Sequence, residues 1–141
     1  MSAELNKAYL YGDVTTVQAC LARGVDINAE SFGYTPLIAA VTYNNLEIVR
    51  ILLARDDLDI AATNSYGNTA LHVACMNGSA ECVTLLGQDR RMTSSIINIK
   101  CNVGNTALMW AVINYKKKFL HELVKHERVS LDLREGAFDG R

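Results

Sequence analysis

The chain has 141 residues, half of them hydrophobic, with a single proline and a formal net charge of −1. This composition excludes a disordered or linker-rich chain, and the balanced charge gives no general attraction to nucleic acid or anionic membranes. The sequence has no uncharged apolar run of membrane-spanning length, and its start, "MSAELNKAYLYGD", lacks the apolar core of a signal peptide. We therefore expect one domain without membrane insertion, located in the cytoplasm, with the nucleus as the alternative compartment.

Four segments in chain order share one pattern. The first, "LNKAYLYGDVTTVQACLARGVDIN" (5–28), is the weakest copy. The next three align closely: "FGYTPLIAAVTYNNLEIVRILL" (32–53), "YGNTALHVACMNGSAECVTLLG" (66–87) and "VGNTALMWAVINYKKKFLHELV" (103–124). Their glycines Gly33, Gly67 and Gly104 are 34 and 37 residues apart. A repeat of this length predicts a solenoid of stacked units.

Each unit predicts a turn followed by two short helices. A threonine such as Thr35 stands where a hydroxyl can cap the first helix, and Pro36 takes the first helical position. Small residues recur at Ala40, Ala74 and Ala111, which allows helices to approach closely. A second turn precedes a second helix, whose apolar residues have helical spacing: Leu46, Val49, Leu52, Leu53, Val83, Leu85 and Leu86. Such short helices must stack to be stable.

The period near 33 residues and the T-P-L-H-x-A pattern resemble the ankyrin repeat. The resemblance implies an all-α ankyrin repeat solenoid of helix-turn-helix units with β-hairpin-like loops. It also implies a single domain over 1–141, with repeats at about 2–29, 30–63, 64–100 and 101–136 and the start of a further repeat at 137–141. By the same resemblance His72 hydrogen-bonds its threonine and tightens the junction between hairpin and helix.

Three departures from the family pattern stand out. Only His72 keeps the histidine of the motif, because Ile38 and Met109 replace the other two. The third unit has a longer loop, "GQDRRMTSSIINIK", and Glu122 stands where an outer-helix leucine is expected.

The stretch around His72 could alternatively form part of a metal site or a thiol–imidazole pair. Cys75 and Cys82 lie near it in sequence, but zinc sites need four ligands, usually in paired short spacings, and no second pair is present. Both cysteines fall at positions that suit small buried side chains. We expect these side chains to pack in the core, and we therefore expect no bound metal or other cofactor. Without C-x-x-C spacing among Cys20, Cys75, Cys82 and Cys101, we also expect reduced thiols.

No catalytic motif emerges from the remaining residues. The phosphate-loop, zinc-protease and nucleophile-elbow patterns are absent from the sequence, so we expect no enzyme activity. The basic run "YKKKFLHELVKHER" (115–128) predicts a solvated outer helix that buries Phe119, Leu120, Leu123 and Val124. Nearby glutamates disfavour a phosphate-binding role for this run, and we expect no nucleic-acid partner.

Two segments carry modification motifs. "LARGVDIN" (21–28) matches the pattern on which asparaginyl hydroxylase acts in many ankyrin proteins, which makes Asn28 a candidate for hydroxylation. The alternative, which we favour, is that Asn28 braces the loop between repeats. "RRMTSS" (90–95) loosely resembles a site for basophilic kinases.

The resemblance places partner binding on the hairpin tips and the inner face of the first helices, a concave and extended surface. Exposed aromatic and methionine side chains among polar ones are typical of protein-binding patches. The predicted binding energy centres on Phe32, Tyr34, Tyr43 and Tyr66. The predicted contact residues are Leu10, Tyr11, Phe32, Tyr34, Thr42, Tyr43, Tyr66, Asn68, Met76, Asn77, Val103, Asn105, Ile113 and Asn114.

The sequence thus predicts a non-catalytic module that binds a partner protein or peptide as a monomeric domain. The alternative is a structural segment of a larger ankyrin scaffold, or an oligomerisation unit, with no dedicated ligand on this face. The segment "AFDGR" (137–141), which opens a further repeat, favours that alternative. The polar fourth outer helix, with Glu122 and its lysines, favours a capped and self-sufficient domain.

Overall fold

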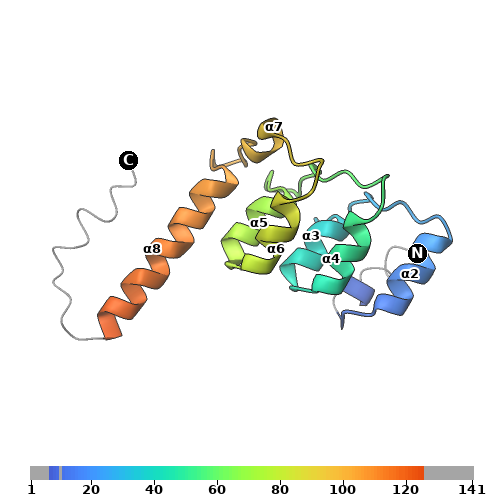
Figure 1. The fold of residues 1–141 in the computed structure, drawn as a ribbon, viewed down its shortest axis with the longest axis horizontal. Helices are drawn as coiled ribbons and strands as arrows, with labels where there is room; N and C mark the ends of the chain where they lie inside the picture. The colour runs from blue at the N-terminus through green and yellow to red at the C-terminus, as the bar shows by residue number, and fades with distance from the viewer. Residues whose placement is uncertain (1–6, 10, 126–141) are drawn as a thin grey trace.

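The structure, a computed structural model, describes residues 7–9 and 11–125, with side chains up to residue 117. Its helices lie side by side in chain order (Figure 1). They are α2 (Val14–Ala22), α3 (Pro36–Thr42), α4 (Leu46–Leu53), α5 (Ala70–Asn77), α6 (Ala80–Gly87), α7 (Ser94–Ile97) and α8 (Ala107–Lys125). The described residues form no strand, only an isolated bridge between Ser31 and Tyr34. The all-α repeat fold is therefore confirmed.

Side-chain hydroxyls cap α3, as the sequence predicts, and also α6. The Thr35 hydroxyl accepts a hydrogen bond from the Ile38 N–H at 3.3 Å, and Pro36 opens α3. The Ser79 hydroxyl accepts from the Cys82 N–H and begins α6. Because a cap satisfies N–H groups that a helix leaves open at its start, each capped helix begins at a position fixed by its own sequence. α4 differs, since its N-cap residue Asn45 makes no side-chain cap bond.

The turn between the two helices of a unit depends on a left-handed residue. Gly12, Asn44 and Gly78 stand at equivalent positions and have φ angles of 69°, 55° and 69°. Glycine and asparagine adopt this conformation at low cost. The chain can therefore reverse and send the second helix back along the first.

The core lies between the helices of successive units. Ala40 and Ala74 are completely buried where inner helices approach closely. The outer helix α4 buries Ile48, Val49 and Leu52 completely, so the predicted apolar stripe is present, with Ile48 added to it. Leu46, Leu53, Val83 and Leu85 are partly buried and pack against this core.

Hydrogen bonds also join neighbouring units. The Asn45 side-chain amide donates to the backbone carbonyl of Tyr9, and the Asn102 amide donates to the Ser65 carbonyl at 3.1 Å. Asn28 links the loops of the first two units: its amide donates to the Asp57 carbonyl at 2.8 Å and its oxygen accepts from the Asp59 N–H at 2.7 Å. The units are thus held in register by polar contacts as well as by packing.

The fourth unit differs from the predicted helix-turn-helix. α8 runs without interruption from Ala107 to Lys125, and its C-terminal half extends beyond the paired helices (Figure 1). Tyr115 stands where the other units have Gly12, Asn44 or Gly78, and Lys116 follows it at the capping position. A tyrosine is costly in the left-handed conformation and a lysine cannot accept an N-cap hydrogen bond. The turn therefore does not form and the helix continues.

The long loop of the third unit is anchored by Arg91. Its guanidinium pairs with Asp89 at 2.8 Å and donates to the carbonyls of Arg55 and Leu53, at 2.7 and 2.6 Å. The Leu53 carbonyl is the last of α4, where helices leave C=O groups open, and Arg55 lies in the turn that follows it. The loop, which includes α7, is thereby fixed to the preceding unit.

Candidate functional site

The hairpin tips expose apolar side chains at one repeated position. Phe32, Tyr66 and Val103 each precede the tip glycine of their unit. Their side chains are 85%, 71% and 74% exposed. Large apolar side chains this exposed stabilise the fold very little, so burial in the core does not account for them.

The tip at Phe32 is also conformationally strained. Ser31 and Tyr34 exchange two backbone hydrogen bonds, at 2.8 and 3.0 Å, around a two-residue turn. Phe32 and Gly33 have φ angles of 54° and 83°, a turn type that favours Asn-Gly. A bulky residue in this conformation is an outlier that costs on the order of 1–2 kcal/mol. Such strain is concentrated at functional sites.

Further exposed side chains lie where the inner helices end. Tyr11 is 78% exposed, Tyr43 43% and Met76 37%, and Asn77 is exposed beside Met76. Tyr34 is 37% exposed at the base of its hairpin. All five predicted aromatic residues are thus at the surface. We call the exposed tips and inner-helix ends together the tip surface.

A hollow of about 110 Å³ lies on the tip surface between α5 and α8. Met76, Trp110, Ile113, Asn114 and Lys117 line it. Three of these residues, Met76, Ile113 and Asn114, belong to the predicted contact set. The two neighbouring inner helices thus create a small site that is suited to an apolar side chain.

Some predicted contact residues do not lie on this surface. Asn68 is only 5% exposed, because Asn64 exchanges backbone and side-chain hydrogen bonds with its backbone and folds it under the tip. Asn68 is therefore corrected from a surface residue to a buried one. Thr42 and Asn105 are half-buried. The Thr42 hydroxyl donates to the Ile38 carbonyl, and the Asn105 carbonyl accepts a hydrogen bond from His72. Leu10 lies outside the described residues.

His72 is a structural residue at the junction between two units. Its Nδ1 accepts a hydrogen bond from the Thr69 N–H at 3.0 Å, which leaves Nε2 protonated to donate to the Asn105 carbonyl at 3.0 Å. The side chain is completely buried. The predicted bond to threonine is confirmed, and a second bond reaches the next unit.

The cysteines near His72 are buried thiols. Cys75 and Cys82 are 7% and 0% exposed, and burial raises the pKa of the Cys75 thiol. A raised pKa disfavours the thiolate that nucleophiles and metal ligands require. Among the described residues, no three His, Cys, Asp or Glu side chains are grouped so that they could hold a metal ion, and none of the described cysteines forms a disulfide.

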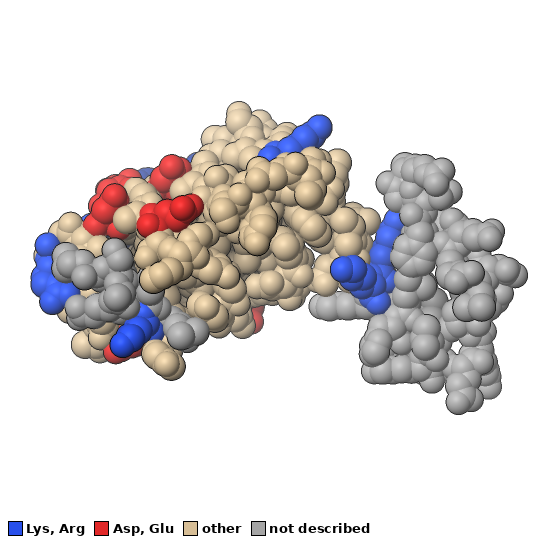
Figure 2. Space-filling model, turned by 180° about the vertical axis from the view of Figure 1, so that it is seen from behind, with Lys and Arg blue, Asp and Glu red and all other residues tan. Residues whose placement is uncertain are grey.

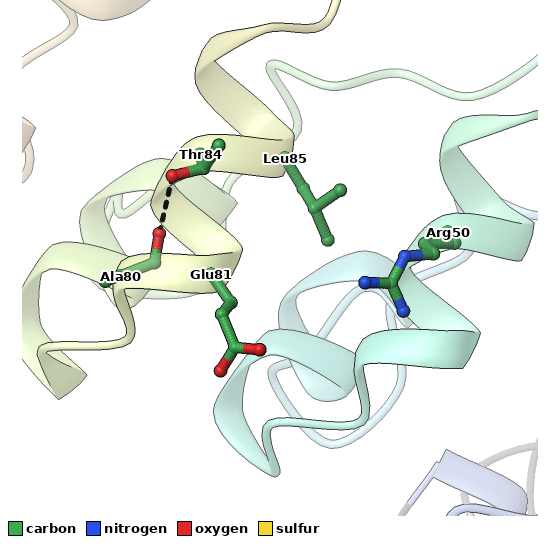
Figure 3. A pocket seen from close by; sticks show the side chains of 5 residues that line it. All are labelled: Arg50, Ala80, Glu81, Thr84 and Leu85. Atoms are coloured by element: carbon green, nitrogen blue, oxygen red, sulfur yellow. Dashed lines mark hydrogen bonds between the residues drawn. The ribbon is translucent and has the colours of Figure 1, made fainter.

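The outer helices form a shallow groove on another face. Arg50 of α4 and Glu81, Thr84 and Leu85 of α6 line it (Figure 3). The Thr84 hydroxyl donates to the Ala80 carbonyl at 2.9 Å within its own helix. One carboxylate and one guanidinium, both exposed, do not provide a nucleophile with a base or an acid–base pair. This groove gives no sign of catalysis.

One exposed surface was not predicted from the sequence. On α8, Leu108, Met109, Val112 and Tyr115 are 69%, 44%, 45% and 70% exposed. The sequence prediction took this unit to be a complete helix pair. The sequence signal for this surface is the helical spacing of Leu108, Val112 and Tyr115, which places them on one side of the helix.

Asn28, the candidate for hydroxylation, is half-buried and uses both side-chain heteroatoms in the bonds to the next loop. Thr93 and Ser94 of the basophilic motif are exposed, and Thr93 caps α7. Modification at these residues stays a prediction. The outer-helix stripe predicted at Phe119, Leu120, Leu123 and Val124 lies outside the described side chains.

Comparison with known families identifies the repeat. A family model described as ankyrin repeats in three copies matches residues 5–94. Repeats of this family are generally non-catalytic protein–protein interaction modules. Within the described residues, no helix is long and apolar enough to cross a membrane.

Several curated proteins are similar to most of this chain. The ankyrin repeat, SAM and basic leucine zipper domain-containing protein 1 of Notamacropus eugenii is 33% identical over 107 residues, 74% of this chain and 22% of that protein. Its namesake in Eulemur macaco macaco is 34% identical over 116 residues, 78% of this chain and 23% of that protein. The E3 ubiquitin-protein ligase XBAT33 of Arabidopsis thaliana is 33% identical over 90 residues, 63% of this chain and 18% of that protein. The chain thus spans about a fifth of the length of these relatives.

Proposed function

Because the chain belongs to the ankyrin repeat family, we propose that it is a non-catalytic recognition module that binds a partner protein or peptide on its tip surface. The observation that carries this proposal is the exposure of Tyr11, Phe32, Tyr34, Tyr43 and Tyr66, one or more from each of the first three units. Aromatic side chains contribute a large share of the energy at protein interfaces.

The chemistry of the tip surface favours an apolar partner segment. The aromatic residues are interleaved with neutral polar ones such as Ser65 and Asn77, and the hollow beside Met76 can accept a small side chain. Interface cores are depleted in charge and enriched in aromatic residues and methionine. We therefore expect a partner that presents apolar side chains, with little dependence of binding on salt.

Affinity capture from cell extract tests the proposal. The wild type is compared with a variant in which Phe32, Tyr34, Tyr43 and Tyr66 are all replaced by alanine, and captured proteins are quantified by mass spectrometry. The proposal predicts proteins that the wild type retains and the variant loses, since interface aromatics contribute about 1–2 kcal/mol or more each.

Two controls make the result interpretable. Circular dichroism must show that the four-site variant keeps its helix content and cooperative unfolding. A second variant, Leu108→Ser with Val112→Ser, removes exposed apolar side chains from α8 instead. Proteins lost with the first variant and kept with the second bind the tip surface. If the folded four-site variant captures the same proteins as the wild type, the proposal is wrong and a structural role without a ligand on this surface is favoured.

A further inference from the structure

The hollow on the tip surface lies between the last two inner helices, α5 and α8, which pack against each other. Its lining residues are Met76 near the end of α5 and, from α8, Trp110, Ile113, Asn114 and Lys117. The four residues of α8 follow one another at intervals of three, one and three positions, which places them on one side of the helix. The hollow is therefore a feature of the junction between the third and fourth units.

The walls of the hollow are mainly apolar. Trp110 stands where α3 has Ala39 and α5 has Val73, which are 6% and 8% exposed. The half-buried indole lines the hollow together with the half-buried Ile113 and with Met76. Tryptophan and methionine are side chains that protein interfaces favour. Since an apolar cavity of about 150 Å³ holds a benzene molecule, the hollow of about 110 Å³ suits a side chain the size of leucine or methionine.

The straight α8 brings a cation to the rim of the hollow. α5 ends at Asn77, which is equivalent to Asn114, whereas α8 continues beyond this level. Lys117, the third residue after Asn114, is exposed and lines the hollow. The equivalent residues of the earlier units are apolar and begin the second helix of each unit: Val14, Leu46 and Ala80. A positive charge at this position is therefore particular to the fourth unit.

Among the described side chains, no carboxylate lines the hollow with Lys117. The sequence has no Asp, Glu, Lys or Arg from 61 to 80 or from 101 to 115. Glu81 of α6 lines the groove on the outer helices, and Glu122 follows Lys117 by five residues, a spacing that places it on a different side of α8. Figure 2 shows lysine side chains on α8 beside the grey part, whereas the largest group of acidic side chains lies toward the other end of the array. A ligand that brings a carboxylate to the rim therefore supplies the opposite charge.

We propose that the hollow selects partner segments in which a leucine, isoleucine or methionine has an aspartate or glutamate next to it or one residue away. The apolar side chain fills the hollow against Trp110 and Met76, and the carboxylate pairs with Lys117 at the rim. One exposed ion pair adds little affinity, so Lys117 determines which apolar segments bind more than how tightly they bind. This inference rests on the proposed function, because it names the segments that the tip surface accepts.

A random peptide library tests the inference with the full chain of 141 residues. Peptides of about 12 residues, which can span about 40 Å and so cross several inner helices about 10 Å apart, are displayed on phage and selected on the wild type. Those that the four-site aromatic variant does not bind are the tip-surface peptides. The inference predicts that they are enriched in aspartate or glutamate beside leucine, isoleucine or methionine.

Two analogues of one tip-surface peptide separate the two contacts. In the first, the amide of asparagine or glutamine replaces the carboxylate; in the second, alanine replaces the apolar residue. Fluorescence anisotropy with labelled peptide measures their affinities. The alanine analogue should bind the wild type at least about tenfold more weakly than the parent peptide, because it leaves the hollow unfilled.

Matched variants locate the binding. Lys117→Glu should weaken binding of the parent peptide at least about fivefold and leave the amide analogue within about twofold. Lys7→Glu makes the same change of charge at an exposed residue near the other end of the array and should leave both peptides within about twofold. Met76→Ala should weaken the parent peptide at least about fivefold, whereas Met109→Ala, at a methionine of similar exposure outside the hollow, should leave it within about twofold. Circular dichroism establishes that each variant is folded.

Three outcomes would overturn the inference and leave the proposed function standing, because the peptides would still depend on the tip aromatic residues. The first is that the tip-surface peptides show no enrichment in aspartate or glutamate. The second is that Lys117→Glu weakens the parent peptide and its amide analogue equally. The third is that Met76→Ala and Met109→Ala have equal effects. If instead every selected peptide binds the folded four-site variant as well as the wild type, the proposed function is wrong and this inference falls with it.

Discussion

At the hairpin tip, replacing Phe32 with a smaller polar residue is expected to stabilise the protein. Phe32 is a bulky residue held at a φ of 54° in a two-residue turn that favours Asn-Gly. We predict that Phe32→Asn increases the free energy of unfolding by about 0.5–1 kcal/mol. Replacing an aromatic residue with a smaller polar one usually destabilises a protein, so the expected gain depends on the backbone strain.

Two opposing contributions determine the magnitude. The left-handed conformation costs an ordinary residue about 1–2 kcal/mol, and asparagine tolerates it far better. The Phe32 side chain is 85% exposed. The small remaining fraction of a ring surface of about 200 Å², at about 25 cal/mol per Å², therefore contributes less than about 0.8 kcal/mol. Relief of strain is the larger contribution.

Urea unfolding followed by far-UV circular dichroism measures the effect. A gain of this size should also raise the midpoint of thermal unfolding by about 2–4 °C. Tyr66→Asn is the matched control, because Tyr66 occupies the same tip position, is 71% exposed and does not have a positive φ. It should change stability by less than about 0.5 kcal/mol. If Phe32→Asn is no more stable than Tyr66→Asn, relative to wild type, the strain argument is refuted.

Three further predictions test the described contacts. His72→Ala should lower the free energy of unfolding by about 2–4 kcal/mol in urea titrations, because it leaves a cavity in the core, leaves the buried Thr69 N–H without its acceptor and removes the bond to the Asn105 carbonyl of the next unit. Met109→Ala, at the equivalent exposed position, should cost less than about 0.5 kcal/mol. Tyr115→Gly with Lys116→Ser should restore the inter-helix turn. Spin labels at positions 108 and 123 should then move from about 22 Å apart, as in a continuous helix, to about 10 Å. An unchanged distance would show that these two residues do not keep α8 straight. Arg91→Ala and Arg91→Lys should both destabilise the protein by about 1–3 kcal/mol, because lysine lacks the guanidinium fork; full stability of the lysine variant would contradict the anchoring role.

The parts of the fold that depend on local sequence were predictable. The caps at Thr35 and Thr69 and the turn at Gly78 each involve residues within a few positions of one another, so the repeat pattern determines them. The exposure of Phe32 and Tyr66 also follows from their place in the repeat. Once a unit is identified, its tip positions are known to project from the stack.

The straight α8 was not predicted because the alignment followed apolar spacing. That spacing continues through residues 119–124, which predicts a second helix, but it contains no information on whether the chain turns before it. The turn depends on the conformation of one residue and the capping of the next, here Tyr115 and Lys116. The missing turn changes the fourth unit, because α8 continues beyond the paired helices and does not fold back.

Two other features depend on contacts that spacing does not reveal. Asn68 is polar and lies next to a tip glycine, which predicts exposure, but hydrogen bonds with Asn64 fold it into the hairpin. Arg91 reaches carbonyls 36 and 38 positions earlier in the chain. A charged residue in a long loop gives no sequence signal for such a partner.

The most direct test of the central claim compares two tyrosines of equal exposure. Tyr66, on the tip surface, is 71% exposed, and Tyr115, on α8, is 70% exposed. The affinities of Tyr66→Ala and Tyr115→Ala are measured by calorimetry against a partner captured by the wild type and lost by the four-site variant. Recognition by the tip surface predicts that Tyr66→Ala weakens binding about tenfold or more, while Tyr115→Ala stays within about twofold of the wild type. Equal affinities for the two variants would contradict it.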